Sequence, residues 1–394
     1  MAVRTIELDG ADAHARGRTY GEAAADQINR AIDFYAASFL RKSGLQWPDL
    51  RDAAPHWVPL VAAYAPDLLE EMRGIAAGAD VGLEDILLLN GRGELNQGNA
   101  FAAAGVPGAV APKDELAEGC TTFAVLPDAT GNGHMVVGQN WDWREAVADT
   151  LVVLRITTPG KPTIITQVEA GQVGRHGANS AGLSLNANGL GGRWNTDLGV
   201  PGTLVRRRIL ESWDMHDALN AACQVPQAYA TNLLLAHRSS IVIDLETTPG
   251  RVGWLYPTDG ILVHGNHFQT FVPTELEATH RPYSLDSLYR VPIVERGLRR
   301  LSHEGSDSAA VRQIVLETMS DHFSFPNSVC SHADSRDHEL VRWSTLMSSL
   351  VDLQTGEYLV TTGVPCSNDY QSLPWNLYDG PAEGDRSDIT PARP

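Results

Sequence analysis

Two short stretches decide the fold: residues 119–122, Gly-Cys-Thr-Thr, and residues 138–143, Gly-Gln-Asn-Trp-Asp-Trp. Between them a β-prone run is followed by a Pro-Asp-Ala-Thr-Gly-Asn-Gly turn and by a second β-prone run. This pattern predicts a β-hairpin that begins at Cys120. Residues 97–119, just upstream, are rich in Ala, Gly and Pro and are expected to form an exposed irregular connection. Cys120 therefore stands where a loop ends and a strand begins, which suits a residue that becomes a chain terminus.

A cysteine at a chain terminus carries its own base. The thiolate is the reactive form, and the α-amino group, with an ordinary pKa of about 7.7–8.0, can take the thiol proton. The bond between Gly119 and Cys120 must first be cut, and the thiol can do this by attacking the Gly119 carbonyl, which gives a thioester that water resolves. Gly119 has no Cβ, so its carbonyl can approach the thiol. The alternative interpretation is that Cys120 is a small buried strand residue, the usual fate of a cysteine.

Asp142 lies at the end of the second predicted strand, so the hairpin returns it to the neighbourhood of Cys120. There a carboxylate could orient the new α-ammonium group and tune its pKa. The alternative is an aspartate in a turn at the strand end that accepts backbone N–H bonds.

These motifs, taken in order, resemble those of the acyl-coenzyme A:6-aminopenicillanic acid acyltransferase family (peptidase family C45), which are cysteine-type N-terminal-nucleophile (Ntn) hydrolases. The family carries Gly-Cys-Thr-Thr followed by Gly-Gln-Asn-Trp-Asp, and the resemblance runs from about residue 15 to about residue 365. Further matching blocks lie at residues 70–76, 90–95, 169–171, 179–183, 264–267 and 342–346.

The resemblance implies an α+β fold, the four-layer αββα Ntn-hydrolase sandwich, with the nucleophile at the start of a central strand. It divides the chain into residues 1–119, a helical propeptide or α-subunit part, and residues 120–394, the β-subunit part, which together make one αββα domain. It also implies cleavage between Gly119 and Cys120.

The resemblance assigns further residues to the site. Asp142 matches a catalytic-site aspartate, and Asn266, in a His-Gly-Asn-His block, matches an asparagine that donates to the oxyanion, a task that suits a side-chain amide. Arg342 matches an arginine of the catalytic region, which could lower the thiol pKa or hold an acyl oxygen; otherwise it is a surface charge. The family has Arg-Gly-Ala-Thr-Leu there, and Trp343 departs from it.

Four further residues receive weaker assignments. Asn186 and Asn188 resemble the block that supplies a backbone oxyanion donor in related bile-salt hydrolases, and the choice between them stays open. Arg73 and Arg92 belong to the motifs of the N-terminal half, where they are expected to support helix contacts and not to take part in the chemistry.

Composition sets outer limits on function. The chain has 394 residues, 43% of them hydrophobic and 20% charged, as in an ordinary globular protein. Its net charge of −18 argues against a nucleic-acid or anionic-membrane partner. No apolar run reaches the length of a membrane helix, and residues 1–10 contain no apolar core of signal-peptide length. Four cysteines are too few for a disulfide framework, so a reduced, cytoplasmic protein is expected.

No metal or cofactor is expected. The cysteines lack the Cys-x-x-Cys spacing of structural zinc. The spacing of His264 and His267 is short for zinc, and no acidic or thiol ligand stands close by in the sequence. Cys330 lies near His322 and His332, but no residue that would orient a Cys–His pair is evident. The chain also lacks a Gly-x-Ser-x-Gly elbow and a phosphate-binding loop.

Periodicity outlines the remaining elements. Apolar residues at helical spacing predict a helix over about residues 19–42, ended by Gly44. The polar residues 383–394 are expected to fray. Helices are expected at about residues 66–77, 82–89, 203–222 and 308–319, strands at 150–157, 162–169, 183–186, 345–352 and 357–362, and a meander at 233–236, 240–244, 251–256 and 261–264.

Two hypotheses follow. The first is a self-processed cysteine amidohydrolase or acyltransferase that acts on a small linear amide or thioester and becomes an α/β heterodimer after cleavage; a homo-oligomer is compatible with it. The second is an uncleaved, non-catalytic scaffold with the same fold that acts by binding.

Overall fold

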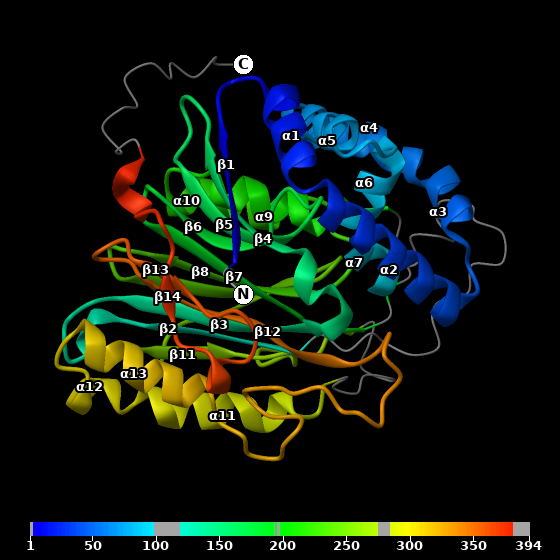
Figure 1. Cartoon of the computed structure of the whole chain (residues 1–394). Coiled ribbons are helices and arrows are strands. Elements are labelled where there is room, and N and C mark those ends of the chain that lie inside the picture. The colour runs from blue at the N-terminus through cyan, green and yellow to red at the C-terminus, as the bar shows by residue number, and fades with distance from the viewer. Residues whose placement is uncertain (1–2, 98–118, 193, 195–197, 275–283, 381–394) are drawn as a thin grey trace.

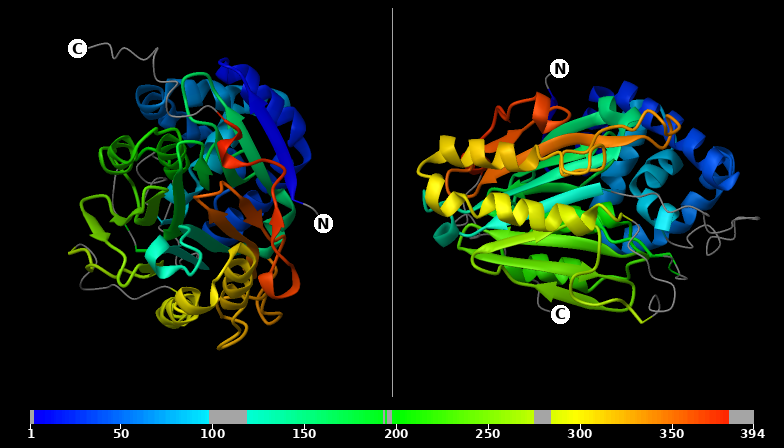
Figure 2. Two further views of the ribbon diagram at one scale, coloured as in Figure 1. Left: turned by 90° about the vertical axis from the view of Figure 1, so that its left-hand side faces the viewer. Right: turned by 90° about the horizontal axis from the view of Figure 1, so that it is seen from below.

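The computed structural model describes residues 3–97, 119–192, 194, 198–274 and 284–380. Two β-sheets are stacked face to face, and helices cover the outer face of each (Figures 1 and 2). The expected four-layer αββα arrangement of the Ntn-hydrolase sandwich is therefore confirmed.

Within the described residues, the larger sheet has eight strands and the smaller has six. Every pair of neighbouring strands is antiparallel except β1 and β4, which run parallel. The larger sheet runs in the spatial order β1 (Arg4–Asp9), β4 (Leu151–Thr157), β5 (Ile164–Glu169), β6 (His176–Asn179), β7 (Leu183–Gly189), β8 (Thr231–His237), β9 (Ile241–Thr247) and β10 (Val252–Leu255). The smaller runs in the order β11 (Ile261–His264), β2 (Gly119–Val125), β3 (Val136–Arg144), β12 (Trp343–Asp352), β13 (Tyr358–Val360) and β14 (Gln371–Ser372).

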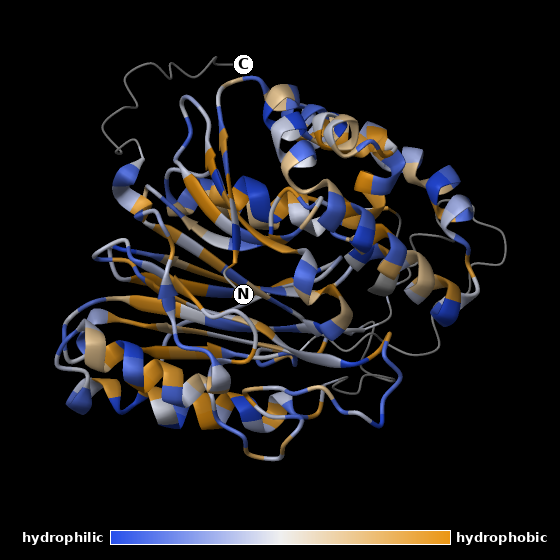
Figure 3. Cartoon of the chain, viewed as in Figure 1, coloured by the Kyte–Doolittle hydropathy of each residue, from blue (hydrophilic) through white to orange (hydrophobic). Residues whose placement is uncertain are grey.

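Amphipathic helices form the two outer layers, with hydrophobic and hydrophilic residues alternating along them (Figure 3). On the side of the larger sheet lie α1 (Ala13–Ala23), α2 (Ala25–Ser43), α3 (Trp47–Ala53), α4 (Trp57–Tyr64), α5 (Pro66–Ala79), α6 (Leu83–Asn90), α7 (Arg92–Gln97), α9 (Gly202–Leu210) and α10 (Met215–Cys223). On the smaller sheet lie α11 (Ser287–Leu298), α12 (Leu301–Glu304) and α13 (Ser308–Met319), which cross its outer face in Figure 2.

Most of the expected elements are present. The hairpin, the strand pair β4–β5 and the helices α5, α6 and α13 are confirmed. Gly44 ends α2 in the left-handed conformation, with φ of 73°. Two expected helices are each divided in two: α1 and α2 meet at Ala24, and α9 and α10 are separated by a break in which the Asp214 side chain caps α10. The predicted irregular connection falls mostly on residues outside those described, as do residues 383–394.

Helices α1 and α5 pack unusually close together because glycines face each other where they cross. A Cβ on Gly17 would lie 1.9 Å from the carbonyl oxygen of Glu71, and one on Gly74 would lie 2.1 Å from that of His14. The buried Glu71 carboxylate, on α5, binds Arg16 of α1 at 3.1 Å and Arg207 of α9 at 3.0 Å. A buried ion pair whose partner is removed leaves an uncompensated charge, so these contacts fix the relative positions of the three helices.

The N-terminal part of the chain contributes a strand as well as helices. Strand β1 was not expected from the sequence, and it pairs with β4 so that Ile6 lies beside Leu154. One contiguous hydrophobic core contains Ile6, Ile28 and Met72 together with Leu154 and Leu377. Residues on both sides of the Gly119–Cys120 bond therefore share a single core.

Strand β11 differs from the expected meander in a way that matters for the site. Strands β8, β9 and β10 follow one another in the larger sheet, but β11 crosses to the smaller sheet and pairs with β2. His264 thereby lies opposite Thr122, two residues from Cys120. The error has a physical reason: alternation of apolar residues indicates a strand but not which sheet receives it.

In the residues that the structure describes, no helix combines the length and the apolar character needed to cross a bilayer.

Candidate active site

Cys120 is the second residue of β2, an inner strand of the smaller sheet between β11 and β3, and only 1% of its surface is exposed. The hairpin register places Gly119 opposite Asp142 and Cys120 opposite Trp141, so the predicted return of Asp142 to Cys120 is confirmed. Successive side chains of a strand point to opposite faces of the sheet. The Cys120 thiol therefore faces the space between the two sheets, whereas the Asp142 carboxylate faces the α11–α13 layer.

Glycine is required immediately before the cysteine. A Cβ on Gly119 would lie 2.1 Å from Cζ3 of the Trp343 ring. Trp343, the residue that departs from the family pattern, thus covers the peptide bond that the sequence suggests is cut. Any side chain at position 119 would displace this ring.

Two buried side chains bind the backbone of Cys120. Its N–H donates to Oδ1 of Asn266 over 2.8 Å, and its carbonyl oxygen accepts from Nη1 of Arg290 over 2.8 Å. Arg290 also donates to that Asn266 oxygen over 2.8 Å. The three residues therefore form one connected network around the start of β2.

Arg290 is the functional candidate that the sequence did not reveal. It lies on α11, is fully buried, and donates to Oγ1 of Thr121 over 2.6 Å and to Oδ2 of Asp286 over 2.7 Å. Burial opposes its charge, but the carboxylates of Asp286 and Asp142 outweigh this effect and raise the pKa of the guanidinium. Pro292 interrupts the helical pattern of this segment, which hides α11 in the sequence. The available signal was the Asp286–Arg290 pair, one helical turn apart.

The structure does not bring Arg342 to Cys120. Its guanidinium is partly exposed and donates to the carbonyl oxygens of Asp337 at 2.9 Å and Ser335 at 3.2 Å. These bonds tie it to its own loop at the start of β12. The catalytic role expected for Arg342 thus finds no support in its geometry, and Arg290 occupies the position that it would need.

Asp142 is buried with only one of its carboxylate oxygens bonded. Oδ1 accepts from the Thr345 hydroxyl over 2.6 Å, whereas Oδ2 has no hydrogen-bond partner among the residues that the structure describes. Burial, only partly opposed by Arg290 and by the bond from Thr345, raises the pKa of Asp142 to about 8. The Cys120 thiol lies 3.9 Å from the backbone oxygen of Asp142. The chain therefore holds a carboxyl group that is readily protonated at neutral pH beside Gly119, the residue that precedes the cysteine.

Asn266 is held by hydrogen bonds from both its backbone and its side chain. Its backbone N–H donates to Oγ of Ser287, at the start of α11, over 2.6 Å, and its side-chain NH₂ donates to the Gly189 carbonyl over 3.0 Å. An amide NH₂ has two donor hydrogens, so this bond leaves a second one. Asn266 thus joins β7 of the larger sheet to Cys120 of the smaller.

His264 anchors the same turn through acidic groups that the sequence did not place there. Its ring is buried, with Nε2 3.0 Å from Oε1 of Glu246 and 3.9 Å from Oδ1 of Asp244. Burial disfavours the imidazolium, but the two carboxylates outweigh it and raise the pKa of His264. Strand β9 supplies both carboxylates, so acidic groups that are distant in the sequence lie beside this histidine.

Asn186 and Asn188 both point between the sheets. Asn188 donates to the His264 carbonyl over 3.0 Å and to Oγ1 of Thr122 over 3.3 Å, which ties β7 to β11 and β2. The NH₂ of Asn186 is buried and finds no hydrogen-bond partner within the described part of the chain. Both side chains thus line the inter-sheet space that the Cys120 thiol faces. The NH₂ of Asn188 is hydrogen-bonded to neighbouring strands.

More unpaired polar atoms face this space. Trp141, directly opposite Cys120, packs edge-on against the His176 ring at 4.9 Å, and the Arg175 guanidinium stacks 4.2 Å over Trp141. Nε1 of Trp141 and both ring nitrogens of His176 are buried, and no described residue forms a hydrogen bond with them. Buried polar groups normally find partners. A space lined by several unpaired ones is therefore suited to a polar ligand or ordered water.

The two arginines of the N-terminal motifs behave differently from each other. Arg73 makes a surface pair with Glu70 at 3.1 Å. Arg92 is buried, binds Glu169 of β5 and Tyr35 of α2, and stacks over Trp143 of β3 at 4.6 Å. Arg92 thus supports contacts between the N-terminal helices and both sheets.

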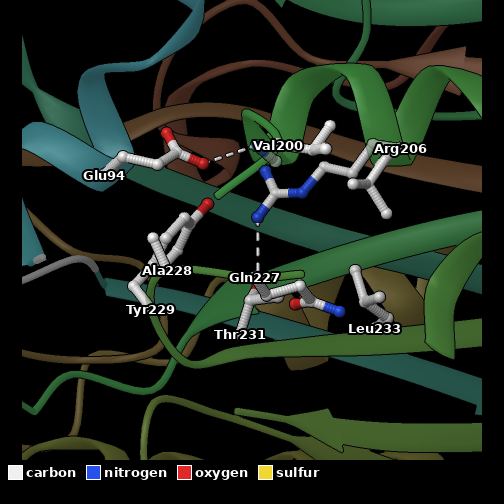
Figure 4. A pocket seen from close by; sticks show the side chains of 10 residues that line it. Glu94, Val200, Arg206, Gln227, Ala228, Tyr229, Thr231 and Leu233 are labelled. Atoms are coloured by element: carbon white, nitrogen blue, oxygen red, sulfur yellow. Dashed lines mark hydrogen bonds between the residues drawn. The ribbon is translucent and has the colours of Figure 1, made fainter. Parts of the chain in front are cut away.

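A small pocket lies behind the larger sheet, between α7, α9 and β8 (Figure 4). Glu94 and Arg206 face it; Glu94 accepts from the Gly202 N–H over 2.6 Å, and Arg206 donates to Thr231 over 3.1 Å. Burial raises the pKa of Glu94 to about 7. The space open to a water-sized sphere is about 10 Å³, roughly enough for one water. None of the residues around Cys120 described above lines this pocket.

Comparison with known proteins places the chain in a family. The family described as acyl-coenzyme A:6-aminopenicillanic acid acyl-transferase matches residues 129–365. The chain is 28% identical over 355 residues to the acyl-coenzyme A:6-aminopenicillanic-acid-acyltransferase 40 kDa form of Emericella nidulans, an alignment that covers 90% of this chain and 91% of the relative.

Solved structures are similar at lower identity. A variant of the conjugated bile acid hydrolase from Clostridium perfringens is 14% identical with a TM-score of 0.43, over 66% of this chain and 98% of that one. Penicillin V acylase from Agrobacterium tumefaciens is 14% identical with a TM-score of 0.39, over 62% and 83%. Because the family match extends over more than half of its residues, the chain belongs to the acyl-coenzyme A:6-aminopenicillanic acid acyl-transferase family.

Proposed function

We propose that this protein is a cysteine Ntn amidohydrolase or acyltransferase that releases its own nucleophile by cutting the bond between Gly119 and Cys120. The observation that carries the proposal is the network around Cys120: Asn266 binds its nitrogen, and Arg290 binds its carbonyl oxygen. A buried cysteine with a purely structural role has no need of a buried arginine and asparagine directed at its backbone.

Self-cleavage proceeds in two steps. The Cys120 sulfur attacks the Gly119 carbonyl carbon, the C–N bond breaks, and the acyl group moves to sulfur while the released nitrogen gains a proton. Water then hydrolyses this thioester, which gives a Gly119 carboxylate, a free Cys120 thiol and a free α-amino group. The bond from Cys120 N–H to Asn266 Oδ1 keeps the nitrogen in place throughout.

Asp142 receives the new terminus. Asp142 carries the unpaired Oδ2 and lies opposite Gly119 in the ladder. Cleavage detaches Gly119 from Cys120 and leaves the new amino group at this point. An ammonium group that forms there favours the ionised carboxylate, which burial alone disfavours. Asp142 would thereby hold the amino group in place. In its neutral form this group is the base for the thiol, and the ion pair with Asp142 stabilises the ammonium formed when it takes the thiol proton.

Turnover uses the same groups on an external substrate. The α-amine takes the thiol proton, sulfur attacks the substrate carbonyl carbon, and the proton passes to the leaving group as an acyl-thioester forms. Water then gives hydrolysis, and an amine gives acyl transfer. The second hydrogen of the Asn266 NH₂ is the proposed side-chain donor to the oxyanion, a role for which preorganised donors are well suited.

The substrate class is a small linear amide or acyl-thioester. The Emericella nidulans relative is by name an acyltransferase between an acyl-coenzyme A and an aminopenicillanic acid, an acyl transfer from a thioester to an amine. In this chain, the thiol faces the inter-sheet space where Trp141, His176 and Asn186 carry unpaired buried polar atoms. We infer that the acyl group carries a polar substituent that these atoms bind.

The test combines intact-mass analysis of the protein with trapping of the acyl group by hydroxylamine. Intact-mass analysis of purified protein is expected to show two fragments that meet between residues 119 and 120. Incubation with a panel of N-acyl p-nitroanilides, quenched with hydroxylamine, is expected to give acyl hydroxamates with the parent protein and none with Cys120→Ala. An uncut chain that neither hydrolyses nor transfers any acyl group would instead favour the non-catalytic scaffold.

A further inference from the structure

Four metal-binding side chains converge at the surface beyond α13, outside the site described above. They are His322, Cys330, His332 and Cys366, and their ligand atoms all lie within 4.8 Å of one another. The first three come from the loop after α13, and Cys366 comes from a 3₁₀ turn, Pro365–Ser367. Two segments that are distant in sequence therefore meet through two imidazoles and two thiols.

The spacing of the donor atoms is that of a tetrahedral zinc site. Zinc–sulfur bonds of about 2.3 Å and zinc–nitrogen bonds of about 2.0–2.1 Å place two nitrogens roughly 3.3 Å apart and a sulfur and a nitrogen roughly 3.5 Å apart. Nε2 of His332 lies 3.1 Å from Nε2 of His322, 3.5 Å from Sγ of Cys330 and 3.4 Å from Sγ of Cys366. All three separations are close to the edges of that tetrahedron.

The loop presents these donors from a well-bonded backbone. The N–H of Cys330 donates to the Asp321 carbonyl over 3.0 Å, and that of His332 donates to the Pro326 carbonyl over 3.0 Å. The Phe325 ring packs 5.0 Å from the His332 ring and 6.0 Å from the His322 ring. Cys330 is buried, whereas His322 and Cys366 are exposed, so an ion can enter from solvent.

We propose that His322, Cys330, His332 and Cys366 form a Cys₂His₂ zinc site. Two thiolates and two imidazoles saturate a tetrahedral ion and leave no open position for a substrate, so the site is structural. Soft sulfur ligands with imidazole favour zinc over magnesium or calcium. The site was missed in the sequence because its ligands do not follow the paired spacing of linear zinc motifs.

The ion would hold the loop that supports Asp142. Ser331, between two of the ligands, donates its N–H to Oγ1 of Thr345 over 3.0 Å and accepts the Thr345 N–H over 3.0 Å. The Thr345 hydroxyl in turn donates to Asp142 over 2.6 Å. The zinc ligands thus lie one residue from a chain of bonds that ends on the candidate catalytic carboxylate.

Metal content tests the proposal directly and without any assay of activity. The full chain is purified without chelators, passed through a sizing column in metal-free buffer and analysed by plasma mass spectrometry. We expect about one zinc ion per chain in the parent protein. Cys366→Ser, which changes an exposed thiol, and Cys330→Ser are each expected to lose most of the zinc.

Two matched controls separate this site from other thiols. Cys223→Ser changes a cysteine on α10, and Cys120→Ala removes the proposed nucleophile; both are expected to retain the zinc. The reduced, zinc-stripped parent protein is also expected to take up Co²⁺ and show the intense visible absorption of a tetrahedral sulfur–nitrogen site, which Cys366→Ser lacks. Because Co²⁺ uptake is measured on the parent protein, this test remains valid even if a variant fails to fold.

Three outcomes would overturn the proposal. The first is a parent protein that contains no zinc and takes up neither Zn²⁺ nor Co²⁺ after reduction. The second is zinc that stays at the parent level in both Cys330→Ser and Cys366→Ser. The third is a disulfide between these two cysteines in protein purified without oxygen, which would make the cluster a redox pair.

Discussion

Gly119 lies directly opposite Asp142 in the β2–β3 ladder. Asp142 carries a buried carboxylate oxygen that has no hydrogen-bond partner in the described ranges, and Gly119 is the residue that self-cleavage would detach. Cleavage would therefore exchange a neutral peptide group for an ammonium group beside a carboxyl that can ionise. This relationship links the generation of the nucleophile to the ionisation of its neighbour.

Processing is expected to depend on the thiol of Cys120. Cys120→Ala should give a single uncut chain that folds, because the thiol supplies the attacking sulfur and little of the packing. Cys223→Ala, which removes a half-buried thiol elsewhere, should be cut like the parent chain. Denaturing gels and intact mass would show this. Two fragments from purified Cys120→Ala would point to an external protease.

Asn266→Ala is expected to impair turnover more than substrate binding. Its proposed donor meets charge that exists only in the tetrahedral state, so kcat should fall by on the order of 10²–10³ with little change in KM. The measurement requires fully processed variant protein, because Asn266 also holds Cys120 N–H and its loss can slow cleavage. A processed variant that turns over an amide at the parent rate would refute the oxyanion assignment.

Arg290 and Arg342 offer a matched pair of substitutions. Arg290→Lys keeps the charge but loses the fork that joins the Cys120 carbonyl to Thr121 and Asn266, so cleavage and turnover should each fall by about 10²-fold. Arg342→Lys, at a partly exposed position, should stay within about twofold of the parent. Cleavage time courses and kcat/KM for both variants are the measurement. The reverse order of effects would restore the assignment of Arg342.

The raised pKa of Asp142 predicts a dependence of stability on pH in the uncut Cys120→Ala chain. Burial raises the pKa of Asp142 to about 8, whereas an unfolded aspartate titrates near 3.9. Between these values the unfolded chain has released the proton that the folded chain keeps. The stabilisation from this carboxyl is therefore complete below about pH 4 and is lost as the pH rises through about 8.

Urea unfolding at about pH 5 and about pH 8 tests this expectation. The free energy of unfolding of Cys120→Ala should fall between the two pH values by on the order of a few kcal/mol more than that of the Cys120→Ala, Asp142→Asn double variant. Parallel behaviour of the two proteins would show that the Asp142 pKa is not raised.

After cleavage, the fragments 1–119 and 120–394 should remain together. Strand β1 pairs with β4, Glu71 binds Arg207, and the two parts share one hydrophobic core, in which about 25 cal/mol is gained per Å² of apolar surface buried. Both fragments should co-elute from a sizing column under native conditions and separate only in denaturant. An active larger fragment that elutes alone would contradict this.

Local sequence patterns predicted the hairpin, and with it the approach of Asp142 to Cys120, because the turn between two adjacent strands determines which residues face each other. The His-Gly-Asn-His block identified Asn266, but not the crossing of β11 that brings it to β2. That crossing depends on how the two sheets pack, which alternation of apolar residues does not record.

Long-range partners were harder to find. Arg290 lies on a helix whose pattern is interrupted by Pro292, and its partners are at the start of β2. The four residues of the proposed zinc site are likewise brought together only by the meeting of the loop after α13 with the turn at Cys366. Residue spacing shows the Asp286–Arg290 pair and the nearness of Cys330 to the two histidines. It does not show the distant partners, which are the start of β2 in the first case and Cys366 in the second.

The distant origin of the groups around Cys120 sets an order of events during synthesis. Asn266 follows Cys120 by 146 residues and Arg290 follows it by 170, so both leave the ribosome long after the thiol. Non-local contacts of this kind form late in folding. A nascent chain that ends before α11 holds the sulfur without the groups that position its backbone. Because cleavage needs Asn266 and Arg290, it would generate the nucleophile only in molecules in which the two sheets have already docked.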